Sequence, residues 1–109
     1  MPTIYKVLGQ SNPAATTATT LYTVPAATNA VVSTISVCNQ AATSGTYRIA
    51  IRPAGAALAA QHYIAYDSTV TANNSTMITI GVTLAATDVI TVYASSANIS
   101  FVAFGTEIS

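Results

Sequence analysis

Thr46-Tyr47-Arg48-Ile49-Ala50-Ile51-Arg52 (residues 46–52) is the stretch that decides the fold class. Tyr47, Ile49 and Ile51 alternate with Arg48, Ala50 and Arg52, and successive side chains of a β-strand point to opposite faces of the sheet. Pro53 follows at once, and proline lacks the backbone N–H that a strand interior needs. The stretch therefore predicts a half-buried β-strand with one apolar face.

Strand-forming residues with a period of two continue on both sides of this stretch. Polar turns such as 39–45 and Asn73-Asn74 separate the segments, and the Ala-rich run 54–60 is too short to stand alone as a helix. The expected strands lie at about 4–8, 20–24, 30–38, 46–52, 61–66, 75–80, 88–93 and 99–104.

Eight short strands in a chain of 109 residues indicate one all-β domain, residues 1–109. The even spacing predicts a single antiparallel β-sandwich, jelly-roll-like, or a small barrel, with the strand order left open. Residues 1–19 are a candidate N-terminal arm that adds to a neighbour's sheet edge. The side chains expected in the core are Tyr22, Val31, Ile35, Val37, Ile49, Ile51, Ile64, Ile78, Ile80, Leu84, Val89, Val92, Phe101 and Phe104.

Charged residues are scarce: they make up 6% of the chain and sum to zero net charge. An ordinary soluble domain has about 25%, and a monomer usually keeps its net charge away from zero. A surface of Thr, Ser and Ala is easily desolvated, which predicts a subunit packed against neighbours. A secreted domain with a hydroxyl-rich surface is the alternative. The six charged residues are Lys6, Arg48, Arg52, Asp67, Asp88 and Glu107.

The same composition argues against nucleic-acid and membrane partners. Three scattered basic residues cannot form the cationic patch that phosphate binding needs. Polar residues interrupt every apolar run before it reaches the length of a membrane span. The first residues lack the apolar region of a signal peptide, so synthesis and assembly are expected in a cytoplasm.

The sequence has few residues of the types used in catalysis, and they form no catalytic motif. Neither a cofactor nor a metal is expected. His62 and Cys38 are the sole residues of their types, with no local motif joining them. Asp67 and Asp88 each stand where a strand meets a turn. Enzymatic activity is therefore not expected, and a hydrolase ranks last. Cys38 is expected as a half-buried inert thiol, with an interchain disulfide as the alternative.

Arg48 and Arg52 lie on one strand face, four residues or roughly 13 Å apart. They form either a solvated sheet face or a clamp that grips a neighbouring subunit through bidentate hydrogen bonds. His62 and Tyr66 are candidates for the same interface, although His62 also fits a structural histidine. A second hypothesis is a carbohydrate- or receptor-binding module that uses Tyr63, Tyr66 and Asn73-Asn74.

Six strings, spread in order over nearly the whole chain, carry a resemblance to a known family. They are Tyr5-Lys6-Val7-Leu8-Gly9-Gln10, Leu21-Tyr22-Thr23-Val24-Pro25-Ala26, Val31-Val32-Ser33-Thr34-Ile35-Ser36-Val37-Cys38-Asn39, Arg48-Ile49-Ala50-Ile51-Arg52-Pro53-Ala54-Gly55, His62-Tyr63-Ile64-Ala65-Tyr66-Asp67 and Phe101-Val102-Ala103-Phe104-Gly105-Thr106-Glu107-Ile108. The chain resembles short structural proteins of tailed-bacteriophage virions.

This resemblance implies a β-sandwich component of the virion with no catalytic residues. The resemblance does not give the position in the virion, but a compact, neutral β domain of this length suits an outer capsid cement or decoration protein. Its expected partners are copies of itself, as a trimer at threefold sites, and other virion proteins such as the major capsid protein or tail components. The alternatives are a small tail, baseplate or fibre-attachment protein, or a binding module at the tail tip.

Overall fold

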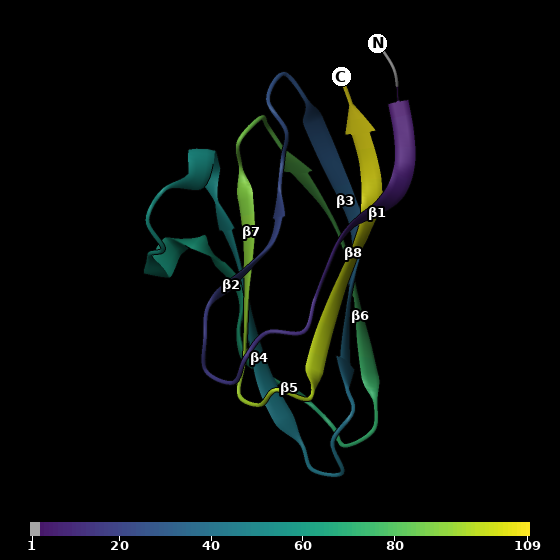
Figure 1. Cartoon of the computed structure of the whole chain (residues 1–109), viewed down its shortest axis with the longest axis vertical. Helices are drawn as coiled ribbons and strands as arrows, with labels where there is room; N and C mark the ends of the chain where they lie inside the picture. Colours follow the sequence, from purple (N-terminus) through teal and green to yellow (C-terminus); the bar gives the residue numbers. More distant parts are fainter. Residues whose placement is uncertain (1–2) are drawn as a thin grey trace.

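Two four-stranded antiparallel sheets pack face to face in the computed structural model of this chain, which describes residues 3–109 (Figure 1). Sheet A has the strand order β1-β8-β3-β6, and sheet B has the order β2-β7-β4-β5. The strands are β1 (Thr3–Ser11), β2 (Thr19–Thr23), β3 (Asn29–Asn39), β4 (Gly45–Arg52), β5 (Tyr63–Val70), β6 (Ser75–Leu84), β7 (Val89–Ala94) and β8 (Ile99–Ile108). The predicted all-β sandwich of eight strands is confirmed.

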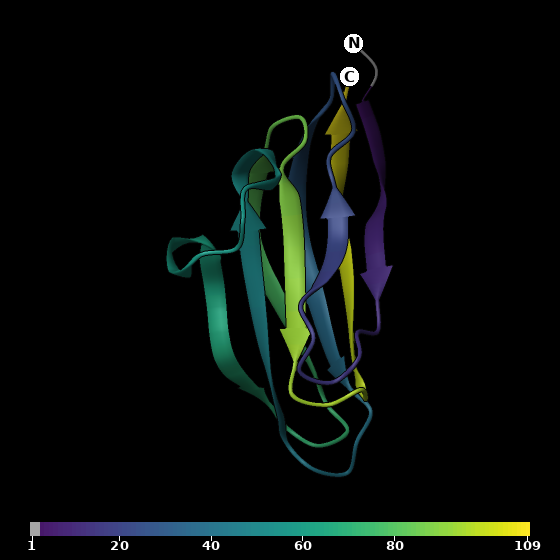
Figure 2. The same cartoon turned by 60° about the vertical axis from the view of Figure 1, so that its left-hand side comes forward.

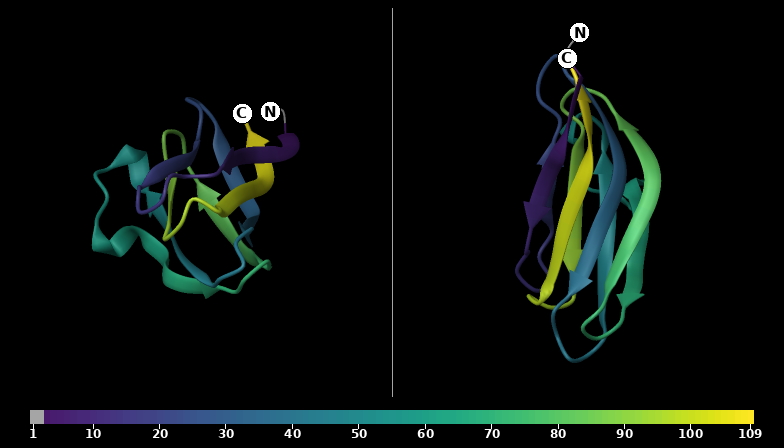
Figure 3. Two further views of the ribbon diagram at one scale, coloured as in Figure 1. Left: turned by 60° about the horizontal axis from the view of Figure 1, so that its bottom comes forward. Right: turned by 90° about the vertical axis from the view of Figure 1, so that its right-hand side faces the viewer.

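The strand order is that of a jelly roll. The chain forms one long hairpin in which β1 pairs with β8, β2 with β7, β3 with β6 and β4 with β5, all antiparallel. Wrapping this hairpin on itself adds the β3–β8 and β4–β7 pairings, which complete the two sheets. Thr3 lies opposite Ile108, so the two ends of the chain lie side by side (Figures 1 and 3).

The turning point of the long hairpin is the connection between β4 and β5, residues 53–62. It contains two single-turn 3₁₀ helices, η1 (Pro53–Gly55) and η2 (Ala60–His62), and projects beside sheet B in Figure 2. Throughout residues 3–109 no helix has both the length and the apolar character to span a bilayer. Leu58, Ala59 and Ala60 of this connection line an open pocket.

Aliphatic side chains fill the space between the sheets. Ile35 of sheet A and Ile49 and Ile90 of sheet B are completely buried. The ring of Phe101 is also buried and meets the ring of Tyr47 edge to face, with centroids 6.3 Å apart and planes at 70°. The core therefore consists of two interlocking layers, one from each sheet.

Three of the expected core residues lie elsewhere, and bulges that change the alternation of side chains account for two of them. Against β8, β3 has a bulge between Val32 and Thr34 in which Ser33 is the extra residue, so Val32 is buried and Val31 faces outward. Ile64 is the extra residue of a bulge in β5 and is 48% exposed. The placement of Val31 and Ile64 in the core was therefore wrong.

Phe104 was also expected in the core but is 37% exposed. It stands three residues after Phe101, and an odd spacing places two strand residues on opposite faces. Phe101 and Ala103 face inward, which leaves Phe104 outside. Ile51 and Ile78 are partly buried against the core, and the side chain of Ile80 lies outside the described residues.

The segment expected as an arm is largely an integral part of the sandwich. Residues 3–11 form β1, which pairs with β8 along its length, with one bulge between Val7 and Gly9. The loop that follows is also fixed, because Asn12 Nδ2 donates to the carbonyl oxygens of Ala97 and Ile99, both at 2.9 Å. Residues 3–11 therefore form the edge strand of sheet A and pair with β8 of their own chain, while residues 1–2 lie outside the described part.

Candidate functional site

The charged side chains are all engaged inside the chain. Two ion pairs and two sets of hydrogen bonds to the backbone account for them. The ion pairs are Lys6 with Glu107 at 3.0 Å and Arg48 with Asp67 at 2.7 Å. Arg52 donates to the carbonyl oxygens of Gly55 and Ala56. Asp88 accepts from the N–H groups of Ala54 and Ala85. The surface therefore has little capacity to attract a charged partner.

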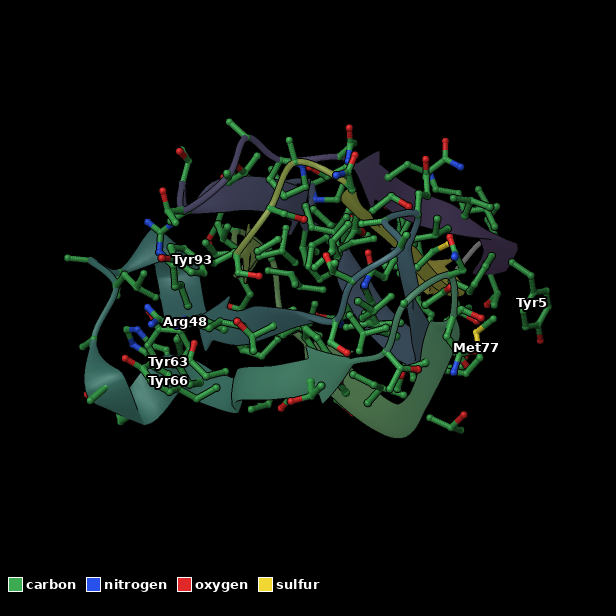
Figure 4. The ribbon with its side chains drawn as sticks, turned by 90° about the horizontal axis from the view of Figure 1, so that it is seen from below. Tyr5, Arg48, Tyr63, Tyr66, Met77 and Tyr93 are labelled. Carbon is green, nitrogen blue, oxygen red and sulfur yellow. The ribbon has the colours of Figure 1, made fainter. Side chains whose placement is uncertain are left out.

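The outer face of sheet A carries no charged side chain among the described residues. The strand registers align it in rows, such as the one in which Val7, Phe104 and Thr34 lie side by side. Its most exposed large side chains are Tyr5 and Met77, at 82% and 61% (Figure 4). We call this surface the neutral face: Tyr5, Val7, Gln10, Val31, Thr34, Ser36, Cys38, Ser75, Met77, Thr79, Thr83, Ser100, Val102, Phe104 and Thr106.

The neutral face can be desolvated at low cost. Aromatic and aliphatic groups gain free energy when they leave water, and a hydroxyl costs far less to bury than an ionised group. Cys38 lies half-buried on this face, as expected of its strand position. Such a surface suits a large neutral contact with another protein.

The outer face of sheet B carries a cluster around Arg48. Arg48 lies directly opposite Tyr93 of β7 in the strand register. On the other side of Arg48, β5 contains a bulge: Tyr47 pairs with Ser68, and Ile49 pairs with Ala65. Two residues of β5, Tyr66 and Asp67, therefore lie opposite the single residue Arg48. Asp67 has a positive φ of 50° at this bulge. The bulge therefore brings two consecutive side chains of β5 to the same arginine.

Arg48 is held on three sides within this cluster (Figure 4). Its Nε donates to Asp67 Oδ1 at 2.7 Å, and its Nη2 donates to Oδ2 at 3.3 Å. The centre of its guanidinium lies 4.2 Å from the ring centroid of Tyr66 and 4.3 Å from that of Tyr93. The hydrogen bond from Arg48 lowers the pKa of Asp67 below its ordinary value, which keeps the pair ionised.

Tyr66 also forms one wall of an open pocket beside the cluster. The ring of Tyr63 meets it edge to face, with centroids 4.9 Å apart. The connection 53–62 completes the pocket, whose volume is about 610 Å³. We call it the tyrosine pocket; its lining residues are Leu58, Ala59, Ala60, Tyr63 and Tyr66.

Arg52 and His62, both expected at an interface, position the connection 53–62. Arg52 donates to the carbonyl oxygens of Ala56 at 2.6 Å and Gly55 at 3.0 Å, and to Thr91 Oγ1 at 3.3 Å. His62 is buried, and its Nδ1 accepts a hydrogen bond from the N–H of Ala59 at 3.1 Å. Arg52 and the Nδ1 of His62 therefore form their hydrogen bonds inside the chain.

The structure brings some of the expected site residues together and separates others. Arg48 and Tyr66 are in contact, whereas the guanidinium of Arg48 is occupied by Asp67 of the same chain instead of reaching out as a clamp. Asn73-Asn74 lies beyond the opposite end of β5 from Tyr63. Tyr93 was missed, because only the pairing of β4 with β7 places it beside Arg48.

A second polar cluster joins β1, β8 and β2 near the chain ends, with Tyr22 buried, Glu107 partly buried and Lys6 exposed. Glu107 Oε2 accepts a hydrogen bond from the hydroxyl of Tyr22 at 2.5 Å, and Oε1 lies 3.0 Å from Lys6 Nζ. These contacts lower the pKa of Glu107 below its ordinary value, with Tyr22 the larger cause. Burial, reinforced by the bond to Glu107, raises the pKa of Tyr22.

The two perturbed carboxylates predict a loss of stability in acid. A carboxyl group whose pKa is lowered in the folded chain binds protons more readily after unfolding. For Glu107 the stabilising effect is therefore present above the unfolded pKa of 4.5. It disappears as the pH falls through the lower pKa of the folded chain. We expect the melting temperature to fall from about pH 5 to about pH 3. In Glu107→Gln with Asp67→Asn this fall should flatten, which thermal denaturation followed by circular dichroism would measure. An equally steep fall in the double variant would contradict the assignment.

The described residues bring no three His, Cys, Asp or Glu side chains together in an arrangement that could hold a metal ion. In comparisons with known proteins, no family model, no curated protein and no solved structure matches this chain.

Proposed function

We propose that this chain is a non-enzymatic structural component of a bacteriophage virion: an outer capsid cement or decoration protein that stabilises the shell through subunit contacts. One observation carries the proposal. The neutral face spans all four strands of sheet A without a charged side chain, while the few charges of the chain are paired elsewhere. A protein that stayed solitary would gain solubility from charges on this face.

The dimensions of the neutral face support a role in a stable contact. Four strands about 4.8 Å apart and roughly 30 Å long cover close to 600 Å² in projection. This is of the same order as the accessible surface of about 800 Å² that each partner contributes to a stable protein complex. The exposed rings of Tyr5 and Phe104 and the side chain of Met77 provide apolar anchors on it.

The fold and the sequence resemblance support the virion role together with this surface. Jelly rolls occur in viral capsid domains, but also in lectins and cupins, so the fold alone does not determine the function. The proposed partners are further copies of the chain, in a trimer, and the major capsid protein, with assembly in the host cytoplasm. A tail, baseplate or fibre-attachment position would use the same neutral face and is the alternative location.

Labelling of particles tests the proposal. An antibody against the chain, applied to gradient-purified particles from cells that carry the gene, should decorate the outer shell in negative-stain images. Label confined to the tail or baseplate would select the alternative location. Particles that contain no copy of the chain, by label and by mass spectrometry, would refute the virion role.

A further inference from the structure

The tyrosine pocket carries an inference that is independent of the proposed structural role. Its volume of about 610 Å³ lies within the range of small-molecule sites, about 300–1,000 Å³. It lies on the outer face of sheet B, whereas the neutral face belongs to sheet A. A ligand in the pocket would therefore leave the neutral face free.

The ring of Tyr66 is exposed but held in place. Tyr66 is 58% exposed, yet the guanidinium carbon of Arg48 lies 4.2 Å from the centroid of its ring. The ring of Tyr63 meets it edge to face, with the two ring planes at 89°. Arg48 is in turn fixed by its two hydrogen bonds to Asp67. A platform that is already ordered loses little conformational freedom when a ligand binds.

The charges around the pocket select the class of ligand. Arg48 and Asp67 neutralise each other, and the lining consists of alanine, leucine and tyrosine. The site therefore offers no uncompensated charge for a phosphate, a carboxylate or an ammonium group. Asp67 keeps carboxylate lone pairs that can accept hydrogen bonds from hydroxyl groups, and the phenol of Tyr63 can both donate and accept.

We propose that the tyrosine pocket binds a neutral oligosaccharide, with one pyranose ring packed on the ring of Tyr66. A pyranose has a face of C–H groups that packs on an aromatic ring and a rim of hydroxyl groups that seek hydrogen bonds. The pocket supplies both: the exposed ring of Tyr66 for the face and the phenol of Tyr63 for the rim. Asp67 does not line the pocket, but it follows Tyr66 in β5 and is held by Arg48 against that ring, so it is a further acceptor next to the pocket. Leu58 and Ala60 of the connection 53–62 also line the pocket.

A microbial glycan array with neutral and anionic oligosaccharides tests this proposal on the isolated chain. We expect binding to neutral members of the array, and calorimetry with the strongest of them to give a measurable affinity. Tyr66→Ala should lower that affinity by about tenfold or more, the scale of losing a central aromatic contact. Tyr66→Phe keeps the ring and should bind nearly as the wild type does.

Tyr5→Ala is the matched control, because it removes an even more exposed ring from sheet A. It should leave the affinity unchanged, and circular dichroism should show that all three variants are folded. The proposal is overturned if no neutral oligosaccharide binds, if anionic ones bind better, or if folded Tyr66→Ala binds as the wild type does. Because the isolated chain is measured, these outcomes do not depend on whether it belongs to a virion.

Discussion

Replacing Phe101 by alanine is expected to lower the free energy of unfolding by about 3–5 kcal/mol, the usual cost of removing a buried phenylalanine. Phe101 is completely buried and packs edge to face on Tyr47, so its removal opens a cavity between the two sheets. For a domain of this size the melting temperature should fall by at least about 12 °C. Chemical denaturation would measure the change directly.

Phe104→Ala is the matched control for this prediction. It deletes the same side chain three residues away, on the outer face of the same strand, where the ring is 37% exposed. We expect it to cost about 1 kcal/mol or less in the isolated chain. Equal losses in the two variants would contradict the orientation of β8, on which the definition of the neutral face depends.

The second large effect is expected from charges placed on the neutral face. Thr34→Glu with Ser36→Glu puts two carboxylates in the middle of β3, between β8 and β6. Burying an unpaired carboxylate costs several kcal/mol, so incorporation into particles should fall by at least about tenfold. Quantitative mass spectrometry of purified particles would measure it, while the isolated variant stays folded.

A variant with the same added charge separates this effect from net charge alone. Ser44 and Thr69 are exposed and lie outside sheet A, in a turn and on β5. Ser44→Glu with Thr69→Glu should therefore incorporate like the wild type. If both double variants were lost from particles to the same extent, the neutral face would have no special role in assembly.

The clearest sequence pattern also predicted its element best. The alternation in 46–52 predicted β4 almost to its ends, Gly45–Arg52, because a core-facing row of Tyr47, Ile49 and the partly buried Ile51 leaves one possible orientation. Strand ends interrupted by glycine were predicted too short. Residues 75–80 were expected as a strand, but β6 continues through Gly81, which has a φ of 60°, to Leu84.

Bulges and strand pairing limited the prediction of the surfaces. An extra residue such as Ser33 reverses the facing of its neighbours, and the alternation pattern alone does not show which residue is extra. The same holds for the β5 bulge that brings Tyr66 and Asp67 to Arg48. Tyr93 joins the cluster through β7, which is more than forty positions away in sequence from Arg48, so only the strand register reveals it.

Hydroxyl-radical footprinting of assembled particles and of the isolated chain tests the central claim most directly. Met77 and Tyr5 mark the neutral face, and Tyr66 marks the other outer face as an internal reference (Figure 4). We expect Met77 and Tyr5 to oxidise several-fold more slowly in the particle, with Tyr66 keeping its rate. Met77 and Tyr5 that oxidise as fast in the particle as in the isolated chain would contradict the burial of the neutral face.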